Sequence, residues 1–186
     1  MKKISPLNLV ALGFLSSCLL TLPNAVQAID PPANTSLSQP KSGLTEANVL
    51  KAMEKITEAE KKEDINTLLS FLVPYGVTEI TVESQGNSVT RNIEGIEAHR
   101  TMLENTYQRV KNREVLNERQ TIRFTPDGQL AIVTRTTIKN VVGEDGKQFI
   151  SGGIDTLRFA WIDNQPKLVS IKSQGWLEER PQTSKK

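Results

Sequence analysis

The sequence predicts an α+β domain in which N-terminal helices pack on one face of a curved antiparallel sheet. In residues 44–72, apolar side chains recur at intervals of three and four positions, which is the spacing of an amphipathic helix. From residue 114 to 176, segments rich in Ile, Val and Thr are separated by short turns that contain Gly, Pro, Asn or Asp. Helices followed by a run of hairpin-connected strands are typical of this fold class.

The first 28 residues have the pattern of a secretory signal peptide. Lys2 and Lys3 precede an uncharged, Leu-rich stretch from Leu7 to Leu22, and the segment ends on Val26-Gln27-Ala28. A basic start, an apolar core and a small-x-small exit define such a leader. The pattern therefore predicts cleavage between Ala28 and Ile29 and export to the periplasm or the medium.

Two other fates of the leader remain open. Leu15-Ser16-Ser17-Cys18 resembles a bacterial lipobox, in which the Cys receives the lipid, although the residues after Cys18 stay apolar through Leu22. An uncleaved anchor would need about 20 consecutive apolar residues, and Pro6, Asn8 and Pro23 bracket a shorter stretch. Attachment to a membrane is expected mainly if Cys18 is lipidated.

Composition excludes several classes of function. The chain of 186 residues has 23 basic and 21 acidic residues, and two of the basic ones lie in the leader, so the mature domain is nearly neutral. Binding to nucleic acid requires a clustered basic surface, and none is expected here. The only Cys is Cys18 and the only His is His99, which excludes a disulfide and a zinc site built from His and Cys. No metal site and no cofactor are expected.

The chain divides into a signal peptide (1–28), a Pro- and Ser-rich linker (29–43), a folded domain (44–179) and a flexible tail (180–186). The linker contains Pro31, Pro32 and Pro40, which favour extended backbone. The folded part has the length of one domain with a single core.

The folded domain is expected to begin with two helices. Apolar residues lie at i, i+4 and i+7 in the first helix: Val49, Met53 and Ile56. The charged run 58–64 follows, and such a run normally forms a solvated helix face. Asp64 is suited to cap the second helix, and Pro74 is expected to end it.

Strands and one further helix make up the rest of the domain. A hairpin is predicted over 79–93 with its turn at 85–88, and a third helix follows Gly95. Four more strands are predicted, over 114–124, 130–142, 148–162 and 167–176.

Two local segments resemble those of a known family. Lys62-Glu63-Asp64-Ile65-Asn66-Thr67-Leu68-Leu69-Ser70-Phe71-Leu72 is similar to a Gly-Asp-hydrophobic-x-x-Leu-Leu-x-Leu helix start, and Gly95-Ile96-Glu97-Ala98-His99-Arg100 to the helix start after a first hairpin. With the order of elements, residues 44–177 resemble the nuclear transport factor 2-like superfamily, which includes SnoaL-like and ketosteroid-isomerase-like domains.

This resemblance implies a cone-shaped half-barrel with a conical pocket between the strongly curved sheet and the helices. The family includes ketosteroid isomerases, dehydratases, polyketide cyclases and transport adaptors, and its members commonly form dimers through the outer sheet face. Its isomerases place acidic and Tyr residues in the pocket, but no local motif transfers those roles to numbered positions of this chain. The resemblance therefore predicts a fold and leaves the function open.

Asp155 is the main candidate for a catalytic residue. If the strand 149–162 alternates regularly, Asp155 lies on the same face as Leu157, Phe159 and Trp161, which are expected to line the pocket. A carboxylate on such a face is poorly solvated, as is typical of a general acid or base. Alternatively, Gly152-Gly153 introduces a bulge that turns Asp155 to solvent.

Tyr107 and His99 are the candidates to assist Asp155. Both lie on the predicted third helix, and the imidazole titrates near neutral pH, which suits proton transfer. Otherwise a lone His at this place is partly exposed and inert. The large aromatic residues Tyr75, Tyr107, Trp161 and Trp176 are expected to fill the core or a dimer interface.

The sequence favours a small exported domain without enzymatic activity. It would bind a small apolar ligand or a protein partner through the pocket, or form a homodimer. The alternative is a pocket enzyme of the isomerase, dehydratase or cyclase type that uses Asp155 as its acid or base, with Tyr107 or His99 assisting.

Overall fold

The structure, a computed structural model, describes residues 43–180. The predicted signal peptide with its cleavage site between Ala28 and Ile29, the alternative lipidation site Cys18 and most of the predicted linker lie outside the described residues. Residues 181–186, most of the predicted tail, lie outside them as well.

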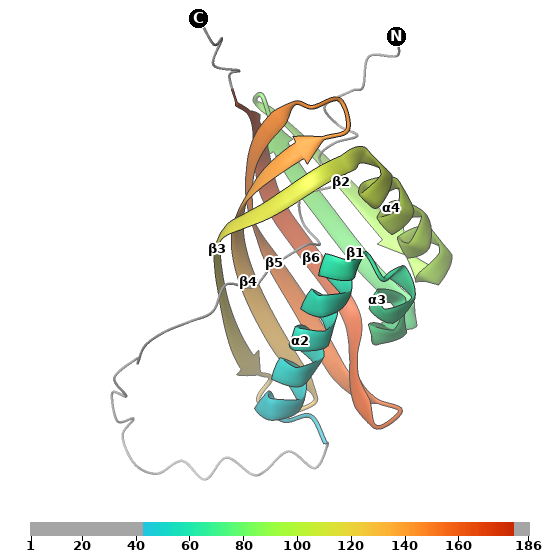
Figure 1. Cartoon of the computed structure of the whole chain (residues 1–186). Coiled ribbons are helices and arrows are strands. Elements are labelled where there is room, and N and C mark those ends of the chain that lie inside the picture. Colours follow the sequence, from blue (N-terminus) through green and yellow to red (C-terminus); the bar gives the residue numbers. More distant parts are fainter. Residues whose placement is uncertain (1–42, 181–186) are drawn as a thin grey trace, which may run out of the picture.

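Within the described part, three helices cover one face of a curved sheet of six strands (Figure 1). The helices are α2 (Glu46–Lys62), α3 (Ile65–Phe71) and α4 (Gly95–Arg109). The strands are β1 (Leu72–Ser84), β2 (Asn87–Glu94), β3 (Val110–Phe124), β4 (Leu130–Gly143), β5 (Gln148–Ile162) and β6 (Gln165–Glu179). Their order in the sheet is β2-β1-β6-β5-β4-β3, so β2 and β3 are open edges. The predicted α+β class with helices on a curved sheet is confirmed.

The sheet is mixed, whereas the sequence predicted antiparallel pairing throughout. β1 pairs with β6 in parallel, and the other four pairings are antiparallel. This pairing joins the first and last strands of the described chain, and a segment containing the helix α4 and four further strands separates them. No local turn signal marks such a long-range contact, so hairpin patterns could not predict it.

The two N-terminal helices begin at side-chain caps. The Thr45 hydroxyl accepts a hydrogen bond from the backbone N–H of Asn48 (3.3 Å), and the Asp64 carboxylate accepts one from that of Thr67 (3.0 Å). The helix α3 ends at Phe71, before the predicted stop at Pro74, because Leu72 already pairs with Leu168 of β6. Pro74 lies where the β1–β6 register shifts, so its missing N–H is not needed for the ladder.

The charged run 58–64 is not uniformly solvated, and here the prediction is wrong for one residue. Glu60 is only 2% exposed, on the same side of α2 as the buried Met53 and Ile56. The position continues the apolar stripe at i+4 from Ile56, so helix geometry turns the carboxylate inward despite its charge. Lys62 and Glu58 do form the expected exposed i, i+4 pair, with Nζ and Oε2 3.1 Å apart.

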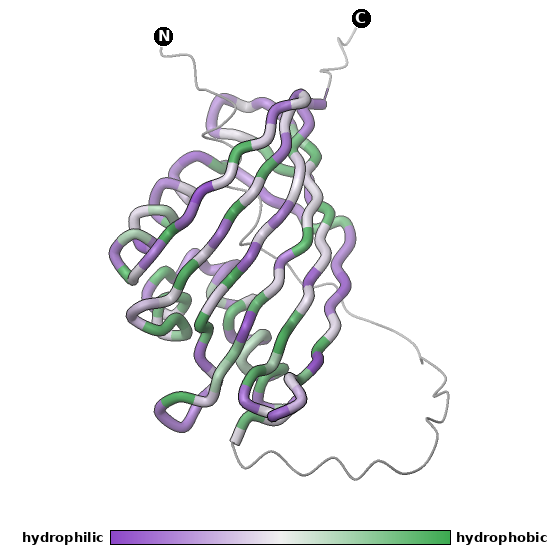
Figure 2. The backbone as a smooth tube through the Cα atoms, turned by 180° about the vertical axis from the view of Figure 1, so that it is seen from behind, coloured by the Kyte–Doolittle hydropathy of each residue, from purple (hydrophilic) through white to green (hydrophobic). Residues whose placement is uncertain are grey.

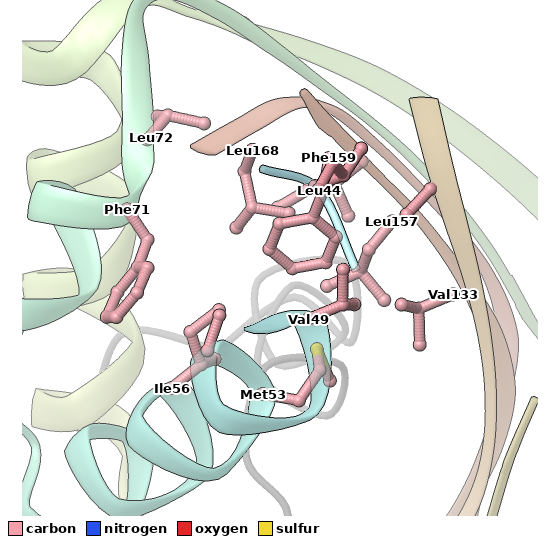
Figure 3. Packing of buried hydrophobic residues seen from close by; sticks show 13 residues of the cluster. Leu44, Val49, Met53, Ile56, Phe71, Leu72, Val133, Leu157, Phe159 and Leu168 are labelled. Atoms are coloured by element: carbon pink, nitrogen blue, oxygen red, sulfur yellow. The ribbon is translucent and has the colours of Figure 1, made fainter. Parts of the chain in front are cut away.

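The main apolar core fills the space between α2 and the concave face of the sheet. Figure 3 shows Val49, Met53 and Ile56 of α2 directed toward Leu157 and Phe159 of β5. Leu44, Phe71, Leu72, Val133 and Leu168 complete the labelled set. Along the strands, apolar and polar residues alternate over much of their length (Figure 2), as expected for a sheet with one buried face.

Candidate functional site

An apolar cavity of about 50 Å³ lies between the three helices and the concave face of the sheet. Most of its lining is aliphatic, and these residues come from helices and strands alike: Ile56, Leu68, Leu69, Leu72, Met102, Leu103, Leu157, Leu168 and Ile171. Five polar side chains also line it: Glu60, Thr78, His99, Arg135 and Asp155. The cavity therefore combines apolar walls with a few polar groups, which is the usual composition of a site for a small molecule.

A buried charge cluster, Glu60–Arg135–Asp155, forms part of this wall. The Arg135 guanidinium donates to Asp155 Oδ2 from Nη2 (3.1 Å) and Nε (3.3 Å), and to Glu60 Oε2 from Nη1 (3.3 Å). All three residues are at most 2% exposed. Burial lowers the pKa of Arg135, but Glu60 and Asp155 more than offset this and raise it above its ordinary value. The guanidinium is therefore a permanent cation.

Regular strand alternation places Asp155 in this cluster. Arg135 on β4, Asp155 on β5 and Ser173 on β6 are direct partners across three neighbouring strands, so their side chains point to the same face. The pairing continues without a register shift through Gly152 and Gly153. The alternative with a bulge at these glycines is therefore wrong, and Asp155 is 1% exposed.

Both oxygens of Asp155 already accept hydrogen bonds. Oδ1 accepts from the Ser173 hydroxyl (2.7 Å), and Oδ2 accepts from Arg135. In this arrangement the carboxylate fixes the position of the guanidinium. Proton transfer to or from a ligand would compete with these hydrogen bonds.

His99 is buried, at 3% exposure, and both ring nitrogens have partners. Nδ1 lies 2.7 Å from the Gly95 carbonyl oxygen, which can only accept, so Nδ1 carries the proton. Nε2 then accepts from the Thr78 hydroxyl at 2.7 Å. Burial lowers the pKa of His99, which favours this neutral form. The partly exposed His considered from the sequence is not what the structure shows.

Not all of the predicted site residues come together. Leu157 lines the cavity with Asp155 and His99, whereas Phe159 and Trp161 lie in the core or against it. Tyr107 is not among the lining residues, and its ring lies beneath the Arg113 guanidinium, 4.8 Å from the ring centroid to Cζ.

Two of the remaining aromatic residues lie away from the core. Tyr75 is 71% exposed, so it does not fill the core. Trp176 lies on the outer sheet face, where its ring covers Gly152. Tyr75 and Trp176 therefore do not fill the core, and a place in a dimer interface stays a prediction for both.

The charged residues on β4 were not predicted as part of the site. Arg135 and Lys139 are each 1% exposed and lie on the inward face of β4 with Ala131, Val133 and Val141. Burial and Arg135 lower the pKa of Lys139 to about 8. Alternation along β4 could in principle predict that Arg135 and Lys139 point inward, because they share a face with Ala131, Val133 and Val141. However, Ile132, Ile138 and Val142 make the other face of the strand equally apolar, so the sequence does not show which face is buried.

Two kinds of feature are absent from residues 43–180. No group of three or more His, Cys, Asp or Glu side chains is arranged to hold a metal ion. No helix in this part of the chain is long and apolar enough to cross a membrane.

Comparison with known proteins rests on structure alone. No family model matches the sequence, and no curated protein matches it. Among solved structures, hexachlorocyclohexane dehydrochlorinase LinA-type3 from Novosphingobium barchaimii is similar with a TM-score of 0.57 and 9% identity, over 73% of this chain and 90% of that one.

Two further structures are similar at the same level. A ketosteroid isomerase-like protein from Erwinia carotovora atroseptica has a TM-score of 0.53 and 10% identity, over 69% of this chain and 94% of that one. A protein of the NTF2-like family from Streptomyces avermitilis has a TM-score of 0.50 and 18% identity, over 69% and 93% of the two chains. At such identities the likeness concerns the fold. Together with the curved six-stranded sheet and the helices on its concave face, it shows that this chain has the nuclear transport factor 2-like cone fold.

Proposed function

We propose that this protein binds a small, mainly apolar molecule in the cavity between its helices and its sheet. The observation that carries the proposal is an aliphatic cavity with the cation of Arg135 in its wall. An apolar ligand with one acceptor group would match this combination of surfaces. Structural neighbours named for activity on small organic molecules, such as hexachlorocyclohexane dehydrochlorinase, support the proposal by analogy of fold.

The size of the cavity limits the ligand. Its volume of about 50 Å³ is smaller than the roughly 150 Å³ of an engineered apolar cavity that binds benzene. A ligand of more than a few atoms therefore requires side chains to move. Met102 and Leu68 are the lining residues that are only partly buried, and the flexible Met side chain adapts readily.

Toluene is a suitable probe for the cavity. We expect saturable shifts of the methyl NMR signals of Leu157 and Ile171 when toluene is added, and native mass spectrometry of the freshly purified protein tests for a molecule that it carries. Leu68→Trp should abolish the shifts by filling the cavity. Leu116→Trp, at a residue that is 46% exposed on β3, is the matched control and should leave them unchanged. Absence of both a saturable shift and a carried molecule would contradict the proposal.

Proton-transfer catalysis is the second candidate function, because Asp155 and His99 line the same cavity. The hydrogen bonds that both side chains already make within the protein favour binding over this alternative. A ligand released from the protein after incubation in D₂O would have gained one deuterium if Asp155 removes and returns a proton. The exchange should then disappear in Asp155→Asn, and equal masses before and after incubation would rule out this function for that ligand.

We further propose that the protein is exported and cleaved between Ala28 and Ile29. The basic start, the apolar core and the small-x-small exit support this location. Mass measurement of the mature protein tests it, since cleavage leaves Ile29 as the N-terminus. Lipidation would instead leave Cys18 at the N-terminus with an added acyl mass, and an intact leader would contradict both forms.

Homodimer formation is proposed through the outer face of the sheet. Ile154 of β5 is 48% exposed and Ile138 of β4 is 36% exposed, and both line a shallow groove with Trp176. Exposed aliphatic residues together on a sheet face favour association. Ile154→Lys should shift a dimer to monomer in native mass spectrometry, and a monomeric wild-type protein would contradict the proposal.

A further inference from the structure

A second, polar cleft of about 160 Å³ lies between the C-terminal turn of α2 and the start of β3. Glu60, Lys61 and Glu63 line it from the helix side, and Lys111 and Arg113 from the strand side. Glu60 lines the apolar cavity as well, but the other four do not. The cleft is therefore a separate site that shares one wall with the cavity.

Arg113 is the most unusual group in this cleft. Its side chain is only 8% exposed, yet Nε and Nη2 are buried without a hydrogen-bond partner. Buried donors in folded proteins are nearly always paired, so two orphaned N–H groups on one cation need a reason. Nε and Nη2 form one edge of the planar guanidinium, and this edge presents two parallel N–H bonds.

The Tyr107 ring packs against the guanidinium of Arg113. The guanidinium carbon lies 4.8 Å from the centroid of the Tyr107 ring, in cation–π geometry. The Tyr107 hydroxyl is also buried without a hydrogen-bond partner. Burial, with Glu60 and Glu63, raises the pKa of Tyr107 and keeps the phenol protonated, so that it can donate.

The acid nearest to Arg113 does not satisfy it. Glu63 Oε1 is 3.8 Å from Nη2, beyond hydrogen-bond distance, and the Glu63 side chain is half exposed. Burial lowers the pKa of Arg113, and Tyr107, Glu63 and Glu60 offset this shift only in part. Within residues 43–180 the guanidinium therefore has an ion pair with Glu63, but no carboxylate lies within hydrogen-bond distance of Nε or Nη2. Lys61 and Lys111 add positive charge to the cleft, and Glu60 and Glu63 add negative charge.

We propose that this cleft binds the carboxylate group of a small ligand on the Nε–Nη2 edge of Arg113. A carboxylate has two oxygens at the spacing of this edge and would form the bidentate pair that guanidinium groups prefer. One carboxylate would satisfy both orphaned nitrogens. The site goes beyond the proposed function, because neither its charge nor its donors depend on the apolar cavity.

Sodium acetate is the probe for this site, with acetamide as its neutral isostere and sodium chloride as the control for ionic strength. We expect acetate alone to shift the Nε–Hε NMR signal of Arg113 in a saturable way. The signal of the exposed Arg119 should not move saturably and serves as the internal control. This measurement uses the wild-type protein and does not depend on whether a variant folds.

Substitutions test whether the shift arises from the proposed geometry. In each variant, acetate binding is measured from the backbone amide NMR signals of residues 110–115. Arg113→Lys keeps the charge but loses the edge, so acetate affinity should fall at least tenfold. Glu63→Gln removes the competing acid and should raise the affinity several-fold. Leu68→Trp, which fills the apolar cavity, should leave acetate binding unchanged, so failure of the two sites can be told apart. The proposal is overturned if acetamide or chloride reproduces the shift, or if Arg113→Lys binds acetate as the wild-type protein does.

Discussion

Arg135 and Asp155 face each other directly across β4 and β5, and their side chains form an ion pair in the interior, with Nη2 and Oδ2 3.1 Å apart. Cross-strand partners in this position point to the same face of the sheet. The pair is more than 98% excluded from solvent, and Glu60 closes it from the helix side. The register of β4 with β5 and the inward face of α2 thus bring two carboxylates to the buried guanidinium of Arg135.

Asp155→Ala should destabilise the protein by about 3–5 kcal/mol, because it removes one partner of a buried pair and leaves Arg135 less compensated. The surface pair of Lys172 and Glu79, at 2.8 Å but 47% and 40% exposed, offers the matched control. Glu79→Ala should change the free energy of unfolding by about 0–1 kcal/mol. Urea unfolding measures both, and equal effects would mean that burial adds nothing to the Arg135–Asp155 pair.

Periodicity predicted the elements of this fold because each helix and strand is marked locally. The i, i+4, i+7 spacing of Val49, Met53 and Ile56 and the cap at Asp64 appear as expected. The parallel pairing of β1 with β6 was not predictable in this way, since it depends on contacts between the ends of the domain.

The candidate site was predictable only in part. Strand alternation placed Asp155 on the apolar face of Leu157 and Phe159, but the sequence left open a bulge at Gly152-Gly153 that would expose it, and only the strand register of the structure decides between the two. The burial of Arg135 could not be predicted, because both faces of β4 contain aliphatic residues. The burial of Glu60 could not be predicted either, because a charged run normally forms a solvated surface. Only the ion pair with Arg135 on the distant strand β4 explains it.

His99 makes the stability of the protein depend on pH in the mildly acidic range. Burial lowers its pKa in the folded state, so the unfolded chain binds a proton first as the pH falls below about 6.5. The wild-type free energy of unfolding should therefore fall from this point downward. His99→Gln should be less stable at pH 7.5 by about 1–3 kcal/mol, since the Thr78 hydroxyl loses its acceptor. The gap between the two proteins should narrow toward pH 5.5 in urea unfolding, and a constant gap would show that His99 does not titrate as proposed.

Gly152 is expected to tolerate no side chain while Trp176 lies over it. A Cβ atom at Gly152 would lie 2.7 Å from Cζ2 of the indole, which is too close for an ordinary contact. Gly152→Ala should therefore displace Trp176, change its fluorescence and destabilise the protein by about 1–3 kcal/mol. In the Trp176→Ala background the same change should have little effect, and additive effects in this double-mutant cycle would contradict the contact.

Lys139 should make the protein gain stability at alkaline pH. Its pKa is lowered to about 8, chiefly by burial, so between about pH 8 and the ordinary value of about 10.4 the unfolded chain binds a proton that the folded chain has released. Under this condition the free energy of unfolding rises with pH. Relative to Lys139→Met, the wild-type protein should therefore gain on the order of a few kcal/mol between pH 7.5 and 10. Lys51→Met, at an exposed position of α2, should show the wild-type slope in the same urea experiment. If Lys139→Met shows that slope too, Lys139 keeps its proton in the folded state throughout this range.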